Sequence, residues 1–265
     1  MTPAEITAAA DALFQADETG QQIGILSVAH PEITMDNAYA IQSELVAKKL
    51  QAGRTILGWK VGLTSRAMQQ ALGINIPDSG VLLDDMEFAN GVTIPEGRFI
   101  QPRIEAEIAF IMKAPLKGQV TRQDVLAATD YVAPAIEILD TRILRTDPVT
   151  GQPRRIFDTI ADNAANAGII LGTSHFDPSE EDLRWTGAIV STNCQVEETG
   201  LGAGVLNDPV NGIIWLANRM DQYGTSIDAG QVILSGSFVR PIECRPGTEI
   251  DADFGSWGHV TCNFD

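Results

Sequence analysis

The segment RIEAEIAF, residues 103–110, alternates side chains with a period of two, which predicts a β-strand. One face of that strand carries Ile104, Ala106, Ile108 and Phe110, as a core requires. Glu105 and Glu107 point to the opposite face, roughly 6–7 Å apart along the strand. An unpaired buried carboxylate is very costly. That face is therefore either solvated or in contact with a positive charge.

Short segments with strand-like patterns recur along the chain and are separated by turns rich in Gly, Pro and Asp. Helices are predicted at residues 121–130 and 209–222. Runs of strands with few intervening helices indicate an α+β fold rather than a doubly wound α/β sheet. The predicted strands span residues 55–63, 104–112, 131–139, 186–192, 231–239 and 258–264.

Two helix starts precede the first strand. Thr2 begins a capping box in TPAE, and Thr34 begins a second helix that Gly53 ends. We therefore expect a helical N-terminal segment, residues 1–75, leading into a β-roll domain, residues 76–265.

The charge of the chain restricts its partners. A net charge of -17 and a pI near 4.4 argue against nucleic acid or an anionic membrane surface. They leave a small anionic substrate open, because local positive charge or a metal overrides the overall field. Three widely spaced cysteines, an N-terminus without a basic region and the lack of a long apolar run favour a cytoplasmic protein.

A third glutamate lies in a second predicted strand. In PAIEILD, residues 134–140, Glu137 interrupts an apolar run, and one short helix fits between this strand and RIEAEIAF. Three carboxylates with no histidine or cysteine nearby indicate a site for Mg²⁺, Mn²⁺ or Ca²⁺ rather than zinc. Taken alone, the pair Glu105 and Glu107 would fit a solvated strand face better.

Two further charges stand out. Lys60 lies between Gly58 and Gly62, which leave open space around its ammonium group. Such a lysine can anchor a carboxylate or act as an acid or base, and a surface lysine between two glycines is the alternative. Asp78 in IPDSG falls in a predicted turn, where aspartate is common for backbone reasons.

Three other segments carry weaker signals. ILSGSF ends a β-branched run with Ser235, Gly236 and Ser237, which suits backbone contacts to an anion and equally suits a strand end. Asp162 offers a polar group beside small residues. GLGAG lacks the spacing and the lysine of a nucleotide-binding loop, so we reject nucleotide binding.

Six segments carry a resemblance to a known family: GWKVGLTS, PDSGVLLDDM, IQPRIEAEIAF, PAIEILDTR, DTIADNAANAGIILG and GQVILSGSF. Together they resemble the 2-oxo-alkenoate hydratases of aromatic catabolism, which belong to the fumarylacetoacetate hydrolase superfamily. The resemblance covers almost the full length. It implies a mixed β-sandwich roll with flanking helices, and a homo-oligomer built from dimers, with a decamer as one candidate.

The resemblance also implies a metal site at Glu105, Glu107 and Glu137, the three acids that the strand patterns already single out. The implied cofactor is Mg²⁺ or Mn²⁺. Lys60 and Asp78 are then the expected catalytic residues. The expected substrate-binding residues are Lys60, Ser235, Gly236, Ser237 and Asp162.

Within this family, Asp78 and the ILSGS segment are typical of hydratases rather than of 4-oxalocrotonate decarboxylase. The long stretch at residues 145–159 favours hydration of 2-oxo-hept-4-ene-1,7-dioate to 4-hydroxy-2-oxoheptane-1,7-dioate, in homoprotocatechuate (4-hydroxyphenylacetate) catabolism. Arg142, Arg154 and Arg155 are candidates for the distal carboxylate. The alternatives are hydration of 2-oxopent-4-enoate, decarboxylation of 4-oxalocrotonate, hydrolysis of an acylpyruvate, and a non-catalytic partner subunit.

Overall fold

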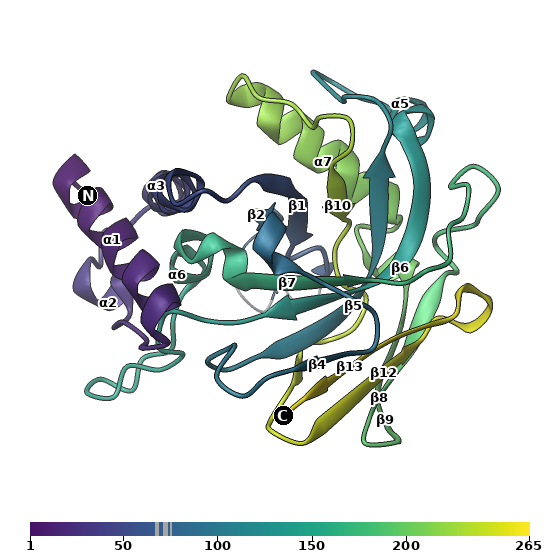
Figure 1. The fold of residues 1–265 in the computed structure, drawn as a ribbon. Coiled ribbons are helices and arrows are strands. Elements are labelled where there is room, and N and C mark those ends of the chain that lie inside the picture. Colours follow the sequence, from purple (N-terminus) through teal and green to yellow (C-terminus); the bar gives the residue numbers. More distant parts are fainter. Residues whose placement is uncertain (67–68, 71–73, 75) are drawn as a thin grey trace.

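The computed structural model describes residues 1–66, 69–70, 74 and 76–265. Helices gather at the N-terminal side of the molecule and above the sheets (Figure 1). The helices are α1 (Pro3–Thr19), α2 (Leu26–Ala29), α3 (Met35–Gln51), α5 (Arg122–Ala128), α6 (Ile156–Ala161) and α7 (Pro209–Gln222).

The larger sheet contains the three glutamates. Its strands are β1 (Ile56–Gly62), β2 (Asp78–Leu83), β3 (Glu87–Phe88), β5 (Arg103–Met112), β6 (Thr129–Leu139), β7 (Asn166–Leu171), β10 (Val232–Leu234) and β11 (Ile242–Glu243). Their order is β2-β1-β10-β5-β6-β7-β3, and β11 pairs with the start of β5. The pairs β1–β10 and β3–β7 are parallel, and the other pairs are antiparallel.

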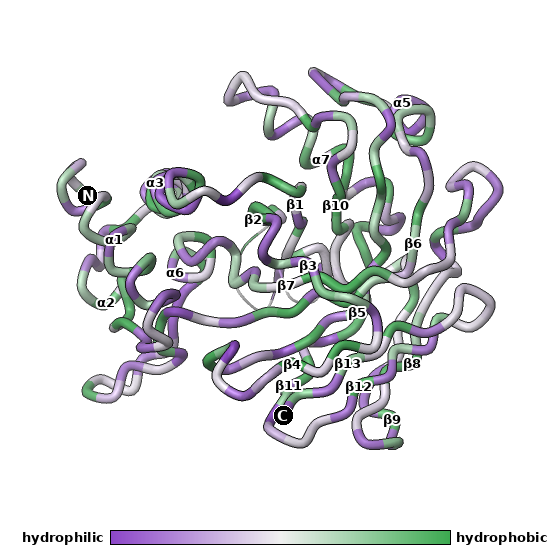
Figure 2. The backbone as a smooth tube through the Cα atoms, viewed as in Figure 1, coloured by the Kyte–Doolittle hydropathy of each residue, from purple (hydrophilic) through white to green (hydrophobic). Residues whose placement is uncertain are grey.

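The smaller sheet lies beside the larger one (Figure 1). Its strands are β4 (Val92–Ile94), β8 (Gly187–Thr192), β9 (Gln195–Leu201), β12 (Thr248–Asp253) and β13 (His259–Phe264), in the order β4-β13-β12-β8-β9. Side chains of both sheets share one core, in which Ile104, Ile108, Val190 and Val260 are fully buried. Hydrophobic residues concentrate in the central strands, whereas the outer loops are more hydrophilic (Figure 2). The predicted mixed α+β fold is confirmed.

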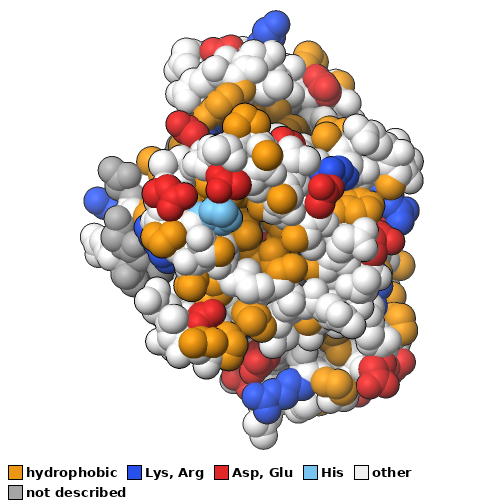
Figure 3. Space-filling view, turned by 90° about the vertical axis from the view of Figure 1, so that its left-hand side faces the viewer, with side chains coloured by type: hydrophobic (Ala, Val, Ile, Leu, Met, Phe, Trp, Pro, Cys, Tyr) orange, Lys and Arg blue, Asp and Glu red, His pale blue; other side chains and the backbone are white. Residues whose placement is uncertain are grey.

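The N-terminal helices form a unit with its own core. Thr2 and Thr34 each accept a hydrogen bond from the backbone N–H three residues further on, so the capping box predicted at Thr2 and the helix start predicted at Thr34 are confirmed. Helices α1 and α3 pack against each other, and α3 also packs against α6, with Leu13, Ile41 and Ile160 buried among them. Acidic, basic and hydrophobic side chains are interspersed on the surface of this side (Figure 3).

The predicted domain boundary falls on residue 75, which lies outside the described residues, so the division remains a prediction. Strand β1, which that division assigns to the N-terminal segment, pairs with β2 and β10 of the larger sheet. In the described part of the chain, no helix is long and apolar enough to cross a lipid bilayer.

Two predicted elements are shorter than expected. The strand predicted at 231–239 ends at Leu234, because the backbone turns at Gly236, where φ is +118°. The helix predicted at 121–130 ends at Ala128, since Thr129 already begins β6. The turn predicted at Asp78 is wrong: this residue opens β2 and pairs with Gly62.

Candidate active site

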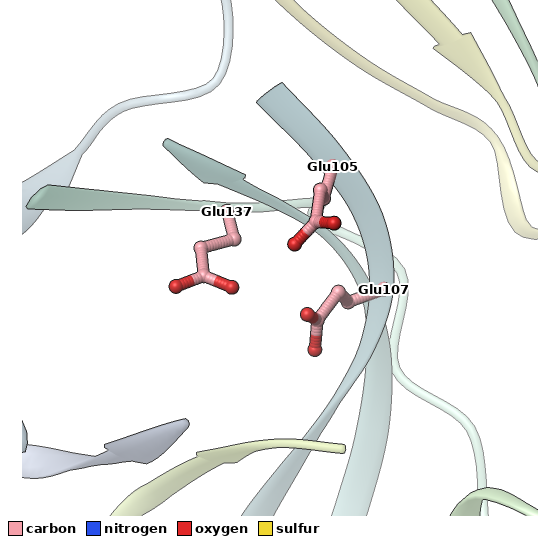
Figure 4. A group of neighbouring side chains, drawn as sticks. All are labelled: Glu105, Glu107 and Glu137. Atoms are coloured by element: carbon pink, nitrogen blue, oxygen red, sulfur yellow. The ribbon is translucent and has the colours of Figure 1, made fainter. Parts of the chain in front are cut away.

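The register of two neighbouring strands brings the three glutamates together. Strands β5 and β6 are antiparallel, and Glu105 lies directly opposite Glu137. Glu107 is one pleat further along the same face of β5. The three carboxylates point toward one another (Figure 4), and one oxygen atom from each lies within 4.8 Å of the others.

Burial makes this arrangement unstable unless a cation balances it. Glu107 and Glu137 are fully buried, and Glu105 is partly exposed. Among the described residues, both oxygens of Glu137 and Oε1 of Glu107 have no hydrogen-bond partner. Like charges that lie opposite each other destabilise a sheet. These unpartnered hard oxygen atoms fit the coordination of a divalent cation such as Mg²⁺.

Lys60 supplies one positive charge beside the three acids. It lies on β1, and its Nζ is 3.3 Å from Oε1 of Glu137, an ion pair without hydrogen-bond geometry. Burial alone favours the neutral amine, but the surrounding carboxylates, Glu137 first, outweigh it and raise the pKa of Lys60. Three carboxylates and one ammonium leave two negative charges, which one divalent cation would balance.

The turn after β10 positions Glu107. The backbone N–H of Gly236 donates a 2.8 Å hydrogen bond to Oε2 of Glu107. The positive φ of Gly236 also lets the backbone pass Thr64, which a side chain at this position would overlap. Gly236 therefore fixes the orientation of the glutamate and leaves its other oxygen available.

Asp78 and Lys60 share a space that Gly62 keeps open. A β-carbon on Gly62 would overlap Oδ1 of Asp78 and would lie 3.0 Å from Nζ of Lys60. Asp78 is buried, and its Oδ1 has no hydrogen-bond partner in the part of the chain that the structure describes. Burial raises the pKa of Asp78, although the Lys60 ammonium opposes this shift.

A cavity of about 400 Å³ opens above these groups. Lys60, Asp78, Glu105 and Ser237 line it, while Glu107 and Glu137 are buried beside Glu105. Apolar lining residues come from the segments that follow β1, β6 and β10. The cavity also contains positive side chains, which are Arg154, Arg155 and Arg240. A small anion with apolar carbons matches this lining.

The predicted ligand-binding residues have different surroundings. Ser237 lines the cavity, and the hydroxyl of Ser235 is buried without a hydrogen-bond partner. Asp162 does not line the cavity. Its carboxylate is buried and accepts hydrogen bonds from the backbone N–H and, at 2.5 Å, from Nε of Arg142. Asp162 and Arg142 therefore form a buried ion pair.

The sequence patterns missed a strained turn in the cavity wall. Asn163, Ala164 and Ala165 have positive φ values of 50°, 53° and 59°. Ala164 and Ala165 line the cavity. The side chain of Asn163 holds the turn through hydrogen bonds to both backbone groups of Val81. Asparagine tolerates this conformation, but nothing in the sequence marks the two alanines.

The carboxylates predict a pH-dependent stability in protein prepared without divalent cations. Burial, with Glu137 nearby, raises the pKa of Glu105 to about 8. The folded protein therefore keeps this proton at a pH where the unfolded chain has released it, and folding becomes less favourable as pH rises from about 4.5 to 8. In Glu105→Gln the decrease in stability that Glu105 causes at rising pH disappears. We expect the melting temperature of the wild type, relative to the variant, to fall across that range. A constant difference in melting temperature would contradict the assignment.

Comparison with known proteins agrees with this geometry. The chain is 51% identical over 259 residues to 2-oxo-hept-4-ene-1,7-dioate hydratase of Escherichia coli, with 97% of each chain covered. The structure of 4-oxalocrotonate decarboxylase from Pseudomonas putida G7, complexed with magnesium and adipate, superposes with a TM-score of 0.93 at 33% identity, covering 100% of this chain and 99% of that one. The chain belongs to the 2-oxo-alkenoate hydratase and 4-oxalocrotonate decarboxylase family. No protein-family model matches it.

Membership of this hydratase and decarboxylase family confirms that the chain is an enzyme. A wider fold relationship extends to fumarylpyruvate hydrolase from Pseudomonas aeruginosa, with a TM-score of 0.58 at 11% identity, covering 78% of this chain and 88% of that one. This likeness supports the predicted roll of the fumarylacetoacetate hydrolase type. The solved structure of that hydrolase is a complex with Mn²⁺ and pyruvate.

Proposed function

We propose that this enzyme adds water to 2-oxo-hept-4-ene-1,7-dioate, or to its 2-hydroxydiene tautomer, and forms 4-hydroxy-2-oxoheptane-1,7-dioate. The observation that carries the proposal is the cluster of Glu105, Glu107 and Glu137 beside a cavity, in a chain 51% identical to a hydratase named for this substrate. Identity to the decarboxylase of known structure is lower, at 33%.

The three glutamates would hold Mg²⁺ or Mn²⁺. Their oxygen atoms suit either ion, and solved relatives are described with magnesium, calcium or manganese. When bound, such an ion acts as a Lewis acid toward the oxygens of the substrate. An ion held by these three residues would be within reach of a substrate in the cavity, because Glu105 lines that cavity.

Lys60 would bind the oxygens of the substrate, and Asp78 would transfer protons. The ammonium of Lys60 is held protonated by Glu137, so it can donate hydrogen bonds to the C1 carboxylate or the C2 oxygen. Asp78 has a free oxygen at the cavity wall and a raised pKa. It can deliver a proton to C5 while the C2 hydroxyl loses its proton to solvent, which gives the conjugated enone. It can then take a proton from the water that adds to C4, and C3 takes up a proton from solvent.

A parallel assay tests the function. Purified protein with Mg²⁺ is given the five-carbon and the seven-carbon 2-hydroxydienoates, and the loss of dienol absorbance and the products are measured. We expect faster conversion of the seven-carbon compound, with a hydroxyl at C4 of the product. Preference for the five-carbon compound would assign 2-oxopent-4-enoate hydration instead. Release of CO₂ from 4-oxalocrotonate, without hydration of either diene, would assign decarboxylation.

Replacement of Asp78 by asparagine tests its role in proton transfer. Asn has the same shape but cannot exchange a proton, so we expect kcat to fall by about 10²–10⁴-fold. Metal affinity should change little, because Asp78 is not among the three clustered glutamates. Hydration at the wild-type rate in Asp78→Asn would remove this residue from the mechanism.

Gly62→Ala tests the shared space of Asp78 and Lys60. The added methyl group must displace one or both side chains, so we expect kcat/KM to fall by about 100-fold, as small misplacements in active sites do. Gly24→Ala is the matched control, because a β-carbon at Gly24 meets nothing within 4 Å. Equal activity of the two variants would show that the spacing does not matter.

Assembly and location complete the proposal. From the resemblance, we expect a homo-oligomer built from dimers, which light scattering after size-exclusion chromatography would measure. We place the enzyme in the cytoplasm, where its three free cysteines, Cys194, Cys244 and Cys262, stay reduced.

A further inference from the structure

The loop between β6 and α6 folds back on itself and returns to the cavity. A bridge between Thr146 and Pro153 closes it, and the N–H of Arg154 donates to the carbonyl of Arg145 at 3.0 Å. The loop extends beyond the N-terminal helices in Figure 1. Because the loop returns, Arg154 and Arg155 lie in the cavity wall.

Arg154 lines the cavity and is half-buried. Its Nη1 donates a 2.5 Å hydrogen bond to Oγ1 of Thr141. Within the described part of the chain, no carboxylate oxygen lies within 4.0 Å of the Arg154 guanidinium, unlike that of Arg142, which Asp162 neutralises. Burial is the largest cause that lowers the pKa of Arg154, and Arg103 and Arg142 lower it further, while Asp162 and Asp158 act against this shift. A half-buried arginine that contacts no carboxylate among the described residues favours an anionic ligand.

The other cavity arginines are already engaged or exposed. Arg240 pairs with Glu198. Arg155 is exposed, stacks over the ring of Phe157 at 4.8 Å and donates to a backbone carbonyl. Among the arginines found to line the cavity, Arg154 is therefore the one that is partly shielded from solvent and is not paired with a described carboxylate.

Strand geometry separates Arg154 from the three glutamates. Its partner Thr141 follows Glu137 by four residues, two of them beyond the end of β6, so the two residues are at most roughly 13 Å apart along the chain. Leu139, between them, lines the cavity. On the antiparallel neighbour, Arg103 lies opposite Leu139, two residues before Glu105. Among the lining residues, Leu139 therefore lies between Glu137 and the segment whose Thr141 holds Arg154, so Arg154 is separated from the three acids along the cavity wall.

Building on the proposed function, we propose that Arg154 binds the carboxylate at the far end of the substrate and makes the enzyme selective for dicarboxylates. The guanidinium matches a carboxylate with two parallel hydrogen bonds. The hydrogen bond from Arg154 to Thr141 keeps the side chain in place before the substrate arrives. A five-carbon monocarboxylate has no group for this contact.

Binding of two unreactive acids tests the inference directly. In the presence of Mg²⁺, calorimetry compares adipate, a dicarboxylate, with hexanoate, a monocarboxylate of the same length. We expect the wild type to prefer adipate. In Arg154→Met, adipate binding should weaken by about 10–100-fold, the range for a lost hydrogen bond to a charged group. Hexanoate binding should stay unchanged, and Arg154→Lys, which keeps the charge, should recover part of the preference.

Activity gives an independent measure. For Arg154→Met, kcat/KM for the seven-carbon diene should fall by a similar factor, while kcat/KM for the five-carbon diene stays constant. Arg122→Met, on the exposed pair with Asp208, is the matched control, and thermal melting verifies that each variant is folded. Arg155→Met should change the substrate preference less than Arg154→Met.

Several results would overturn the inference: no adipate preference in the wild type, equal loss of both acids in Arg154→Met, or a larger effect at Arg155. If the wild type converts neither diene, the proposed function fails. The ratio of adipate to hexanoate affinity would still decide the role of Arg154.

Discussion

Glu107→Gln is expected to abolish metal binding and turnover together. The Gln carbonyl can still accept the hydrogen bond from Gly236, so the fold around the site should persist. The amide presents an N–H donor where the unpartnered carboxylate oxygen now lies. A neutral donor cannot replace a carboxylate ligand of a hard cation. Mg²⁺ affinity should fall by more than about 100-fold, because even residues that merely support a ligand change affinity by about 10–100-fold.

Calorimetry with Mg²⁺ and the dienol assay measure the two effects in one preparation. Glu249→Gln, at an exposed position of strand β12, is the control and should retain both properties. Glu107→Gln should also be more stable than the wild type in chelator, since it removes one of three crowded buried acids. Full metal affinity in Glu107→Gln would show that these carboxylates do not form the metal site.

Lys60→Met is expected to separate catalysis from metal binding. The variant removes the ammonium beside Glu137 and leaves the three carboxylates in place. Metal affinity should be retained or increase, because the site becomes more negative. Turnover should fall by about 10²–10³-fold, the usual loss when one preorganised donor to a developing charge is removed. Without divalent cations, the variant should melt at a lower temperature than the wild type.

Lys49→Met is the matched control for burial of a lysine. Lys49 is also buried, and its Nζ lies 2.5 Å from Oδ2 of Asp17; neither residue lines the cavity. Its loss should lower stability and leave the turnover of the folded enzyme unchanged. If Lys60→Met retains turnover, or loses metal affinity together with turnover, the proposed role of Lys60 is wrong.

Local patterns predicted the faces of the strands that carry the site. Alternation in β5 placed Glu105 and Glu107 on one face and Ile104 and Ile108 in the core, as the structure shows. Capping residues marked helices α1 and α3 for a similar reason, since a cap depends only on the next three residues. Each of these features depends on neighbours in the sequence.

The strand register and the strand order depend on non-local pairing, which local sequence patterns did not predict. The register that sets Glu137 opposite Glu105 joins two strands, and Lys60 approaches them only because β10 lies between β1 and β5. Asp78 belongs to a strand because Gly62, on the neighbouring strand, leaves room for its side chain. Asp162 pairs with Arg142, which lies twenty residues away in the sequence, and local patterns do not show this contact.

Restoring one ion to stripped wild-type enzyme tests the account most directly. The protein is freed of divalent cations with a chelator, and the seven-carbon 2-hydroxydienoate is added before and after titration with Mg²⁺. We predict that 4-hydroxy-2-oxoheptane-1,7-dioate forms only after Mg²⁺ is added, and that the rate saturates at one ion per chain. Hydration at the same rate in the stripped protein would contradict the metal-dependent mechanism at Glu105, Glu107 and Glu137.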